Sequence, residues 1–195
     1  MTESRSTLSR RHSLWGTLTI LAALAYLGVA AIQIPHGPFD EELTTTIDYL
    51  NDGAFAAALL LSVVGILALG AATAAPRAAT ALAALGQLLV FSGVVAGLSA
   101  GESPSWFAAV GLPGNLLAFV GMAMLARHAW RTRALPAWLA VLMVLAVPVG
   151  VGVAEYGGSI VPALVWLTVG ARLRRGGVAT DRTTEARGSA QLATR

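Results

Sequence analysis

The chain has 195 residues, of which 56 % are hydrophobic, and its mean hydropathy of +0.70 is too high for an ordinary soluble domain. It contains no cysteine, which excludes disulfides, thiol nucleophiles and cysteine-ligated metal sites. The net charge is +3, and all 13 basic residues are arginines. Because these arginines flank long apolar stretches, we expect them to face the headgroups of the lipid bilayer and not a nucleic acid.

The polar breaks between the apolar stretches alternate in charge along the chain. Arginines occupy the N-terminal segment, the breaks around Arg77 and Arg131, and the C-terminal segment. Acidic residues without arginine occupy the breaks between them, as at Asp48, Glu102 and Glu155. Arginine is retained on the cytoplasmic side of a membrane, and one crossing needs about 20 apolar residues. The pattern predicts an all-α, multi-pass protein of the cytoplasmic membrane, a bundle of six transmembrane helices with both termini cytoplasmic.

In chain order, we expect a cytoplasmic tail at residues 1–13, a transmembrane domain at 14–173 and a disordered basic cytoplasmic tail at 174–195. Pro35 should end the first helix, and Pro113 should kink the fourth. The six helices are expected at about 14–34, 54–75, 79–98, 106–126, 135–153 and 159–173.

The longest external segment, residues 39–52, has amphipathic spacing. Phe39, Leu43, Ile47 and Leu50 recur so that they share one helical face. We expect either an amphipathic helix on the outer membrane surface or an extension of the second transmembrane helix, capped at Asp40. In the first case the segment should stop at Asp52-Gly53.

Two amides fall inside the expected spans. Gln87 lies about eight residues from the inner end of the third helix, and Asn115 about nine residues from the outer end of the fourth. Since these helices are antiparallel, both side chains should lie near the bilayer centre, where they can face each other. They are candidate substrate contacts; the alternative is a hydrogen bond that only holds two helices together.

The third helix also carries three glycines at intervals of four, Gly93, Gly97 and Gly101. This spacing forms a groove that lets another backbone approach closely. Packing within the monomer is one interpretation, and a homodimer contact is the other.

Glu155 is the third candidate polar contact, because the last helix is short. The 15 residues from Gly157 to Ala171 reach only ~22 Å, less than the ~30 Å hydrocarbon core. The turn at Glu155 should then lie below the headgroups and could anchor a cavity open to the outside. The alternative is a glutamate that faces water beside a thinned bilayer.

Several enzyme classes lack their residues here. None of the three histidines lies within an expected span, and no charged residue lies near the middle of one, whereas ion-coupled carriers usually need such a group. We therefore predict no catalytic residue, no cofactor and no metal.

The alternating charges, the Arg-x-Arg-x-Leu-Pro-x-Trp junction from Arg131 to Trp138 and the Ala/Gly/Leu/Val-rich helices resemble small six-span membrane proteins typical of GC-rich bacteria. This resemblance implies a membrane bundle and carries no activity over. The first functional interpretation is a non-enzymatic protein that acts through lipids, another membrane protein or a second copy, as an accessory or membrane-stress component. The alternative is a small transporter or exporter of an apolar compound, and an intramembrane enzyme comes third. A continuous cavity reaching Gln87, Asn115 or Glu155 would favour transport, and an exposed apolar groove would favour a partner.

Overall fold

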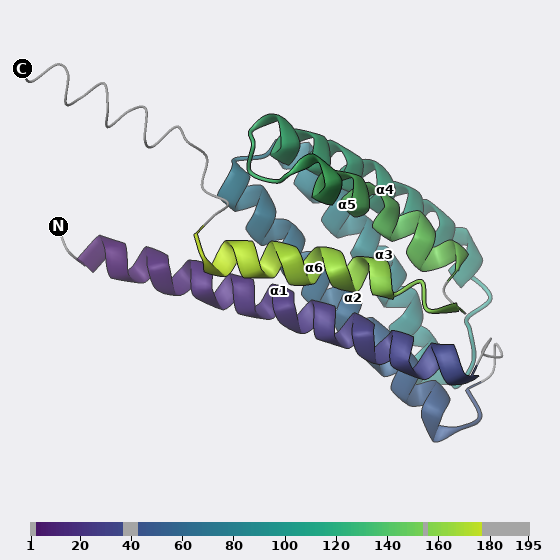
Figure 1. Cartoon of the computed structure of the whole chain (residues 1–195). Helices are drawn as coiled ribbons and strands as arrows, with labels where there is room; N and C mark the ends of the chain where they lie inside the picture. Colours follow the sequence, from purple (N-terminus) through teal and green to yellow (C-terminus); the bar gives the residue numbers. More distant parts are fainter. Residues whose placement is uncertain (1–2, 37–42, 154–155, 177–195) are drawn as a thin grey trace, which may run out of the picture.

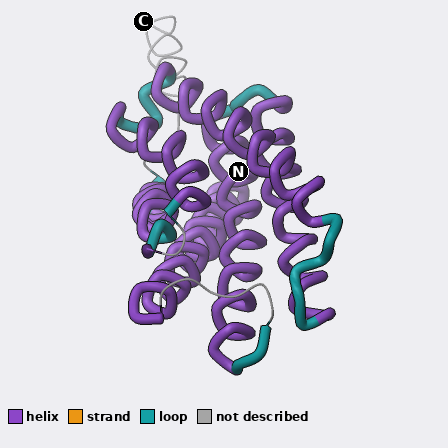
Figure 2. Tube along the Cα trace, turned by 90° about the vertical axis from the view of Figure 1, so that its right-hand side faces the viewer, coloured by secondary structure: helices purple, strands orange, loops and turns teal. Residues whose placement is uncertain are grey.

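A computed structural model describes residues 3–36, 43–153 and 156–176. These residues form helices joined by loops, and no strand occurs among them (Figures 1 and 2). The helices are α1 (Glu3–His36), α2 (Thr46–Thr73), α3 (Arg77–Ala100), α4 (Phe107–Arg131), α5 (Ala137–Gly152) and α6 (Ile160–Arg174).

The helices form a ring in chain order. Each one packs against the next, and α6 packs back on α1. Across the ring, α2 also contacts α6 and, more sparingly, α4. Within the described residues, α5 contacts α4 and α6 and no other helix. The N-terminal end of α1 and the C-terminal end of α6 lie at the same end of the bundle (Figure 1). Because successive helices are antiparallel, the helix ends that carry Arg77, Arg131 and Arg172 lie at this same end of the bundle.

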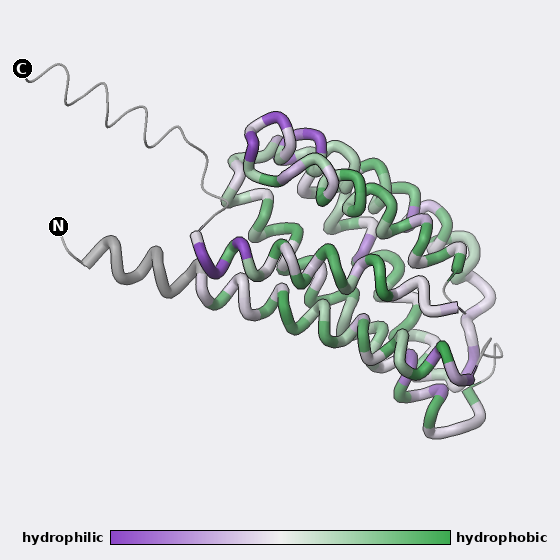
Figure 3. The backbone as a smooth tube through the Cα atoms, viewed as in Figure 1, coloured by the Kyte–Doolittle hydropathy of each residue, from purple (hydrophilic) through white to green (hydrophobic). Residues whose placement is uncertain are grey.

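Four helices are long and apolar enough to cross a membrane: α1 from Ser13, α2, α3 and α4. Apolar residues dominate the middle of the bundle, and hydrophilic ones gather towards its ends (Figure 3). α5 is apolar but has 16 residues, and α6 has 15, so they reach only ~24 and ~22 Å. The described structure therefore has four membrane-length helices and two shorter ones.

α1 begins at Glu3, eleven residues before the expected start at 14. The segment from Glu3 to Ser13 contains neither proline nor glycine, so nothing in it breaks a helix. At the other end α1 continues past Pro35 to His36. A proline in the last turn removes only one hydrogen bond from a helix that is about to end.

α2 begins at Thr46 and passes through Asp52 and Gly53 without a break, so residues 46–52 extend α2 and do not form a separate surface helix. Thr45 is the N-cap: its backbone N–H donates to the Asp48 carboxylate at 2.7 Å, and its hydroxyl accepts from the Asp48 N–H at 3.3 Å. This capping box explains the start of the helix. Residues 39–42, including the expected cap Asp40, lie outside the described residues.

α4 is continuous across Pro113 and extends to Arg131, five residues beyond the expected end. The loop to α5 is correspondingly short, and Arg133 adopts a left-handed conformation in it, with φ of 57°. His128, on the last turns of α4, lies with its Nε2 3.0 Å from the Thr73 carbonyl at the end of α2. α5, α6 and α3 differ from the expected ranges by one or two residues at each end.

Two helix pairs pack through glycines. A Cβ on Gly86 of α3 would lie 2.5 Å from the Gly114 carbonyl oxygen of α4, and one on Gly121 would lie 2.8 Å from the backbone carbon of Leu82. A Cβ on Gly170 of α6 would lie 2.8 Å from the Gly16 carbonyl oxygen of α1. Real Cβ atoms do not approach backbone this closely, so these contacts need glycine.

Candidate functional site: a cavity with two amides

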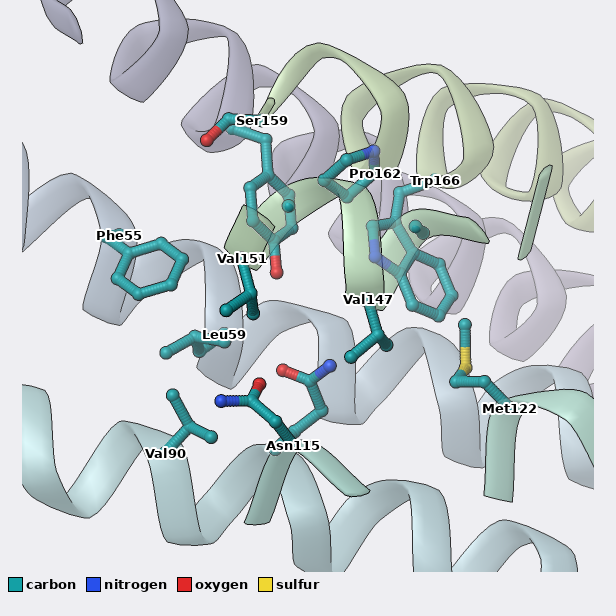
Figure 4. A pocket seen from close by; sticks show the side chains of 14 residues that line it. Phe55, Leu59, Val90, Asn115, Met122, Val147, Val151, Ser159, Pro162 and Trp166 are labelled. Carbon is teal, nitrogen blue, oxygen red and sulfur yellow. The ribbon is translucent and has the colours of Figure 1, made fainter. Parts of the chain in front are cut away.

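A cavity of about 50 Å³ lies between the helices (Figure 4). All six helices contribute to its wall, and every lining residue is either apolar or an uncharged polar residue. The lining residues are Tyr26, Phe55, Leu59, Gln87, Val90, Asn115, Met122, Ala146, Val147, Gly150, Val151, Ser159, Pro162 and Trp166.

The close approach of α3 and α4 brings the two amides to this cavity. Gly86 and Gly114, whose backbones nearly touch, directly precede Gln87 and Asn115 in sequence. The glycines therefore bring the two backbones together, and both amides line the space beside this contact.

Gln87 is buried, with 8 % of its surface exposed. Its Oε1 has no hydrogen-bond partner among the described residues. Leaving a buried acceptor unpaired costs about 1–3 kcal/mol. A group that enters the cavity and donates a hydrogen bond would remove this cost.

Asn115 is partly buried, and its amide orientation is set within α4. Its Nδ2 donates to the Gly111 carbonyl at 3.0 Å, one turn earlier. The amide donor is thus used inside the helix, and the acceptor Oδ1 is the end available for another group.

Tyr26 adds a hydroxyl to the cavity wall. It is 4 % exposed, and its oxygen lies 3.5 Å from the Ser62 Oγ, which has a shorter bond of 2.7 Å to the Ala58 carbonyl. Ser159 lies at another part of the wall, with its Oγ 3.4 Å from Gln33 Oε1. Neither long contact fully satisfies the hydroxyl concerned.

Aromatic and sulfur-containing side chains form much of the remaining wall. Trp166 is 2 % exposed and fits against Gly65, where a Cβ would lie 2.9 Å from its ring. Phe55 meets the ring of Tyr26 edge-on at a centroid distance of 6.3 Å. Figure 4 shows Phe55, Trp166 and Met122 around the same space as Asn115.

Of the predicted polar contacts, the structure brings Gln87 and Asn115 together at one cavity. Glu155 lies outside the described residues, so its place in the cavity stays a prediction. None of the three predicted glycines lines the cavity. Gly93 faces the ring of Phe107, Gly97 lies near the turn before α4, and Gly101 is the C-cap of α3 with φ of 79°.

Sequence reasoning missed Tyr26, Ser159 and Trp166 as lining residues. Trp166 carried a usable signal: tryptophan prefers the membrane interface, and this one lies in the middle of its helix. Tyr26 similarly places a hydroxyl deep within α1. Ser159 had no such signal, because it immediately precedes a helix, where serine is common.

The described residues that line the cavity include no carboxylate, arginine or histidine. These residues supply amide groups and hydroxyl groups for hydrogen bonds, and apolar and aromatic side chains for hydrophobic contact. This arrangement suits the binding of an uncharged molecule.

Compared with known protein families, curated proteins and solved structures, the chain shows no significant similarity to any of them. The cavity therefore has to be interpreted from its own residues.

Proposed function

We propose that this protein is a membrane transporter or exporter of a small, predominantly apolar compound, which binds in the cavity between its helices. In this proposal all six helices cross the cytoplasmic membrane, both termini are cytoplasmic, and no covalent chemistry takes place. The observation that carries it is the cavity that reaches both Gln87 and Asn115, the feature that separates a transporter from a protein that only binds a partner.

The position and composition of the cavity support the proposal. The cavity touches all six helices, so a small movement of any helix changes its shape. α5 is the wall most free to move, because its packing against α4 and α6 is the least extensive around the ring and it contains Pro148. A proline inside a helix weakens the local hydrogen-bond ladder.

The alternative function is action through lipids or a partner protein. The observation that would support it is the apolar outer surface of the bundle. On α4 the exposed side chains Leu112, Leu116, Val120 and Met124 recur every four residues. Lipid chains alone can cover such a stripe in a membrane protein, so the stripe does not require a protein partner. The cavity is the more specific feature.

Filling the cavity tests the proposal. Gly150 lines it, and the nearest neighbour of an added Cβ there would be Pro162 at 3.9 Å, so Gly150→Leu should occupy the cavity without a backbone clash. Gly152 lies on the same helix with nothing within 4 Å of an added Cβ, which makes Gly152→Leu the matched control.

The measurement is the concentration of octanol, and separately of heptyl methyl ether, that halves the growth of cells expressing each protein at equal membrane abundance. Cells with the wild type or Gly152→Leu should differ from empty-vector cells in their tolerance of at least one compound, and cells with Gly150→Leu should not. If the two leucine variants behave alike, or if no protein changes tolerance, the proposed function is wrong.

A further inference from the structure

The size of the cavity limits what can enter it. A cavity of about 150 Å³ holds benzene, and this one has about 50 Å³, which is room for about three or four water-sized groups. A ring cannot enter without a rearrangement of the helices. A hydroxymethyl group with one or two further carbons can.

The chemistry of the wall selects the kind of polar group. Gln87 Oε1 is a buried acceptor without a partner, and the donor of Asn115 is already bound to Gly111. Each amide therefore has an acceptor oxygen without a partner beside the cavity, and a ligand that donates a hydrogen bond would satisfy one of them. Among the described residues that line the cavity none is charged, so beside them an ionised group would lose its hydration without compensation.

The wall of the cavity formed by α5 is thin, so the alkyl part of a bound ligand can extend through it out of the cavity. Val151 of α5 lines the cavity and is also 56 % exposed on the outside of the bundle. In the part of the chain that the structure describes, α5 packs against α4 and α6 and no other helix covers its outer face. An alkyl chain that passes beside Val151 reaches the lipid directly.

We infer that the cavity takes the uncharged hydroxyl end of an alkyl amphiphile, with Gln87 Oε1 as the acceptor and the alkyl chain directed past Val151. This inference rests on the proposed function and adds the class of ligand, its orientation and the residue that determines specificity. Gln87 is then a binding residue with a stated chemical role and not only a link between helices.

The test uses the purified full-length protein in detergent and follows tryptophan fluorescence, because Trp166 lines the cavity. The Trp166→Phe variant identifies which part of the signal comes from that residue. Octanol and heptyl methyl ether are the matched probes, since they have the same number of heavy atoms and only octanol has a hydrogen-bond donor. Octanol should bind about tenfold more tightly than the ether, the effect of one good hydrogen bond to a buried acceptor.

The variant Gln87→Met keeps the length of the side chain and removes the acceptor. It should bind both probes with similar affinity, because the preference for octanol depends on Oε1. Asn115→Leu, which alters the other amide, should retain a preference for octanol. If Gln87→Met does not fold, as judged by gel filtration and circular dichroism, the comparison of the two probes on the wild type still decides whether the cavity recognises the hydroxyl.

Three further probes define the ligand. Octanoate and octylammonium should bind more weakly than octanol, because their ends are charged. Dioctanoylglycerol carries the same hydroxyl on two chains, and its competition with octanol would identify a membrane lipid as the source of the hydroxyl; its failure to compete would identify a free single-chain compound.

Equal binding of octanol and the ether to the wild type overturns the inference about the hydroxyl and leaves the proposed function standing. A preference that persists in folded Gln87→Met overturns the role of Gln87. Absence of saturable binding by every probe overturns the inferred class of ligand, and unchanged tolerance in cells overturns the proposed function itself.

Discussion

Gly86 is one of the residues at which the backbones of α3 and α4 come very close, and its backbone position should tolerate no side chain. Gly86→Ala places a Cβ against the backbone of Gly114 and Ala118, so the helices must separate, at a cost of about 1–3 kcal/mol. We expect a lower melting temperature in detergent. The separation should also displace Gln87 and weaken octanol binding.

Gly97→Ala is the matched substitution on the same helix. An added Cβ there finds only ordinary contacts, 3.5 Å from the Glu102 carbonyl oxygen and 3.8 Å from Pro104. Alanine is about 1 kcal/mol more favourable than glycine inside a helix, so this variant should be at least as stable as the wild type. Equal destabilisation by the two substitutions would contradict the role assigned to Gly86.

At the site, the sequence predicted some of the important residues and not others. Gln87 and Asn115 could be found because amides are rare within apolar spans and their depths match. The glycines that place them were not found, because Gly86 meets Gly114 across two helices and neither has a glycine four residues away in its own helix. A GxxxG spacing pointed instead to Gly93, Gly97 and Gly101, of which Gly101 serves the end of α3.

The C-terminal end of α2 is the place where one substitution should most clearly increase the stability of a helix. Its C-cap, Ala74, has φ of 50° and ψ of 41°, a left-handed conformation that costs a residue with a Cβ roughly 1–2 kcal/mol. Ala74→Gly should therefore raise the free energy of unfolding by about 1 kcal/mol. The measurement is thermal or denaturant unfolding in detergent.

Ala71→Gly, three residues earlier and inside the helix, is the control for Ala74→Gly. It should lower the free energy of unfolding by about 1 kcal/mol, because glycine is unfavourable within a helix. Opposite signs for the two substitutions would support the left-handed cap. A loss of stability in both would show that α2 continues through Ala74.

Helix boundaries were predicted less well than helix positions, for a physical reason. The expected ranges followed the change from apolar to polar residues, which marks the edge of a membrane and not the end of a helix. α1, α2 and α4 all continue beyond that change into polar segments. Their ends depend on local devices such as the Thr45–Asp48 capping box, which hydropathy does not register.

The six-crossing topology can be tested directly, and α5 and α6 make the test informative because each is shorter than a full crossing. The chain has no cysteine, so single cysteines can be introduced at Thr44, Arg77, Ser103 and Thr132. Thr44 is preferred to Thr45, whose hydroxyl caps α2.

A membrane-impermeant thiol reagent should label Thr44→Cys and Ser103→Cys in intact cells. It should label Arg77→Cys and Thr132→Cys only after the membrane is permeabilised, because arginine-bearing loops are retained inside. Labelling of Thr132→Cys in intact cells would place the loop between α4 and α5 outside and refute the proposed topology.

The ring of helices itself could be predicted only in part from the sequence. Short loops make sequential helices antiparallel neighbours, and this accounts for the contacts from α1 through to α6. The contact between α6 and α1 joins the two ends of the chain and depends on Gly16 and Gly170, which no local pattern relates to each other.

That last contact bears on how the protein is made. The face of α1 that carries Gly16 and Ile20 packs against Gly170 of α6, and α6 is synthesised after α1 to α5. Until α6 is made, this face of α1 lacks its packing partner. The contact between α1 and α6 joins residues that are very distant in sequence, and such contacts form slowly during folding. During this interval α6 of a second nascent chain can pack on the same face of α1. Domain swapping of α6 between two chains is therefore the misassembly that we expect for this architecture.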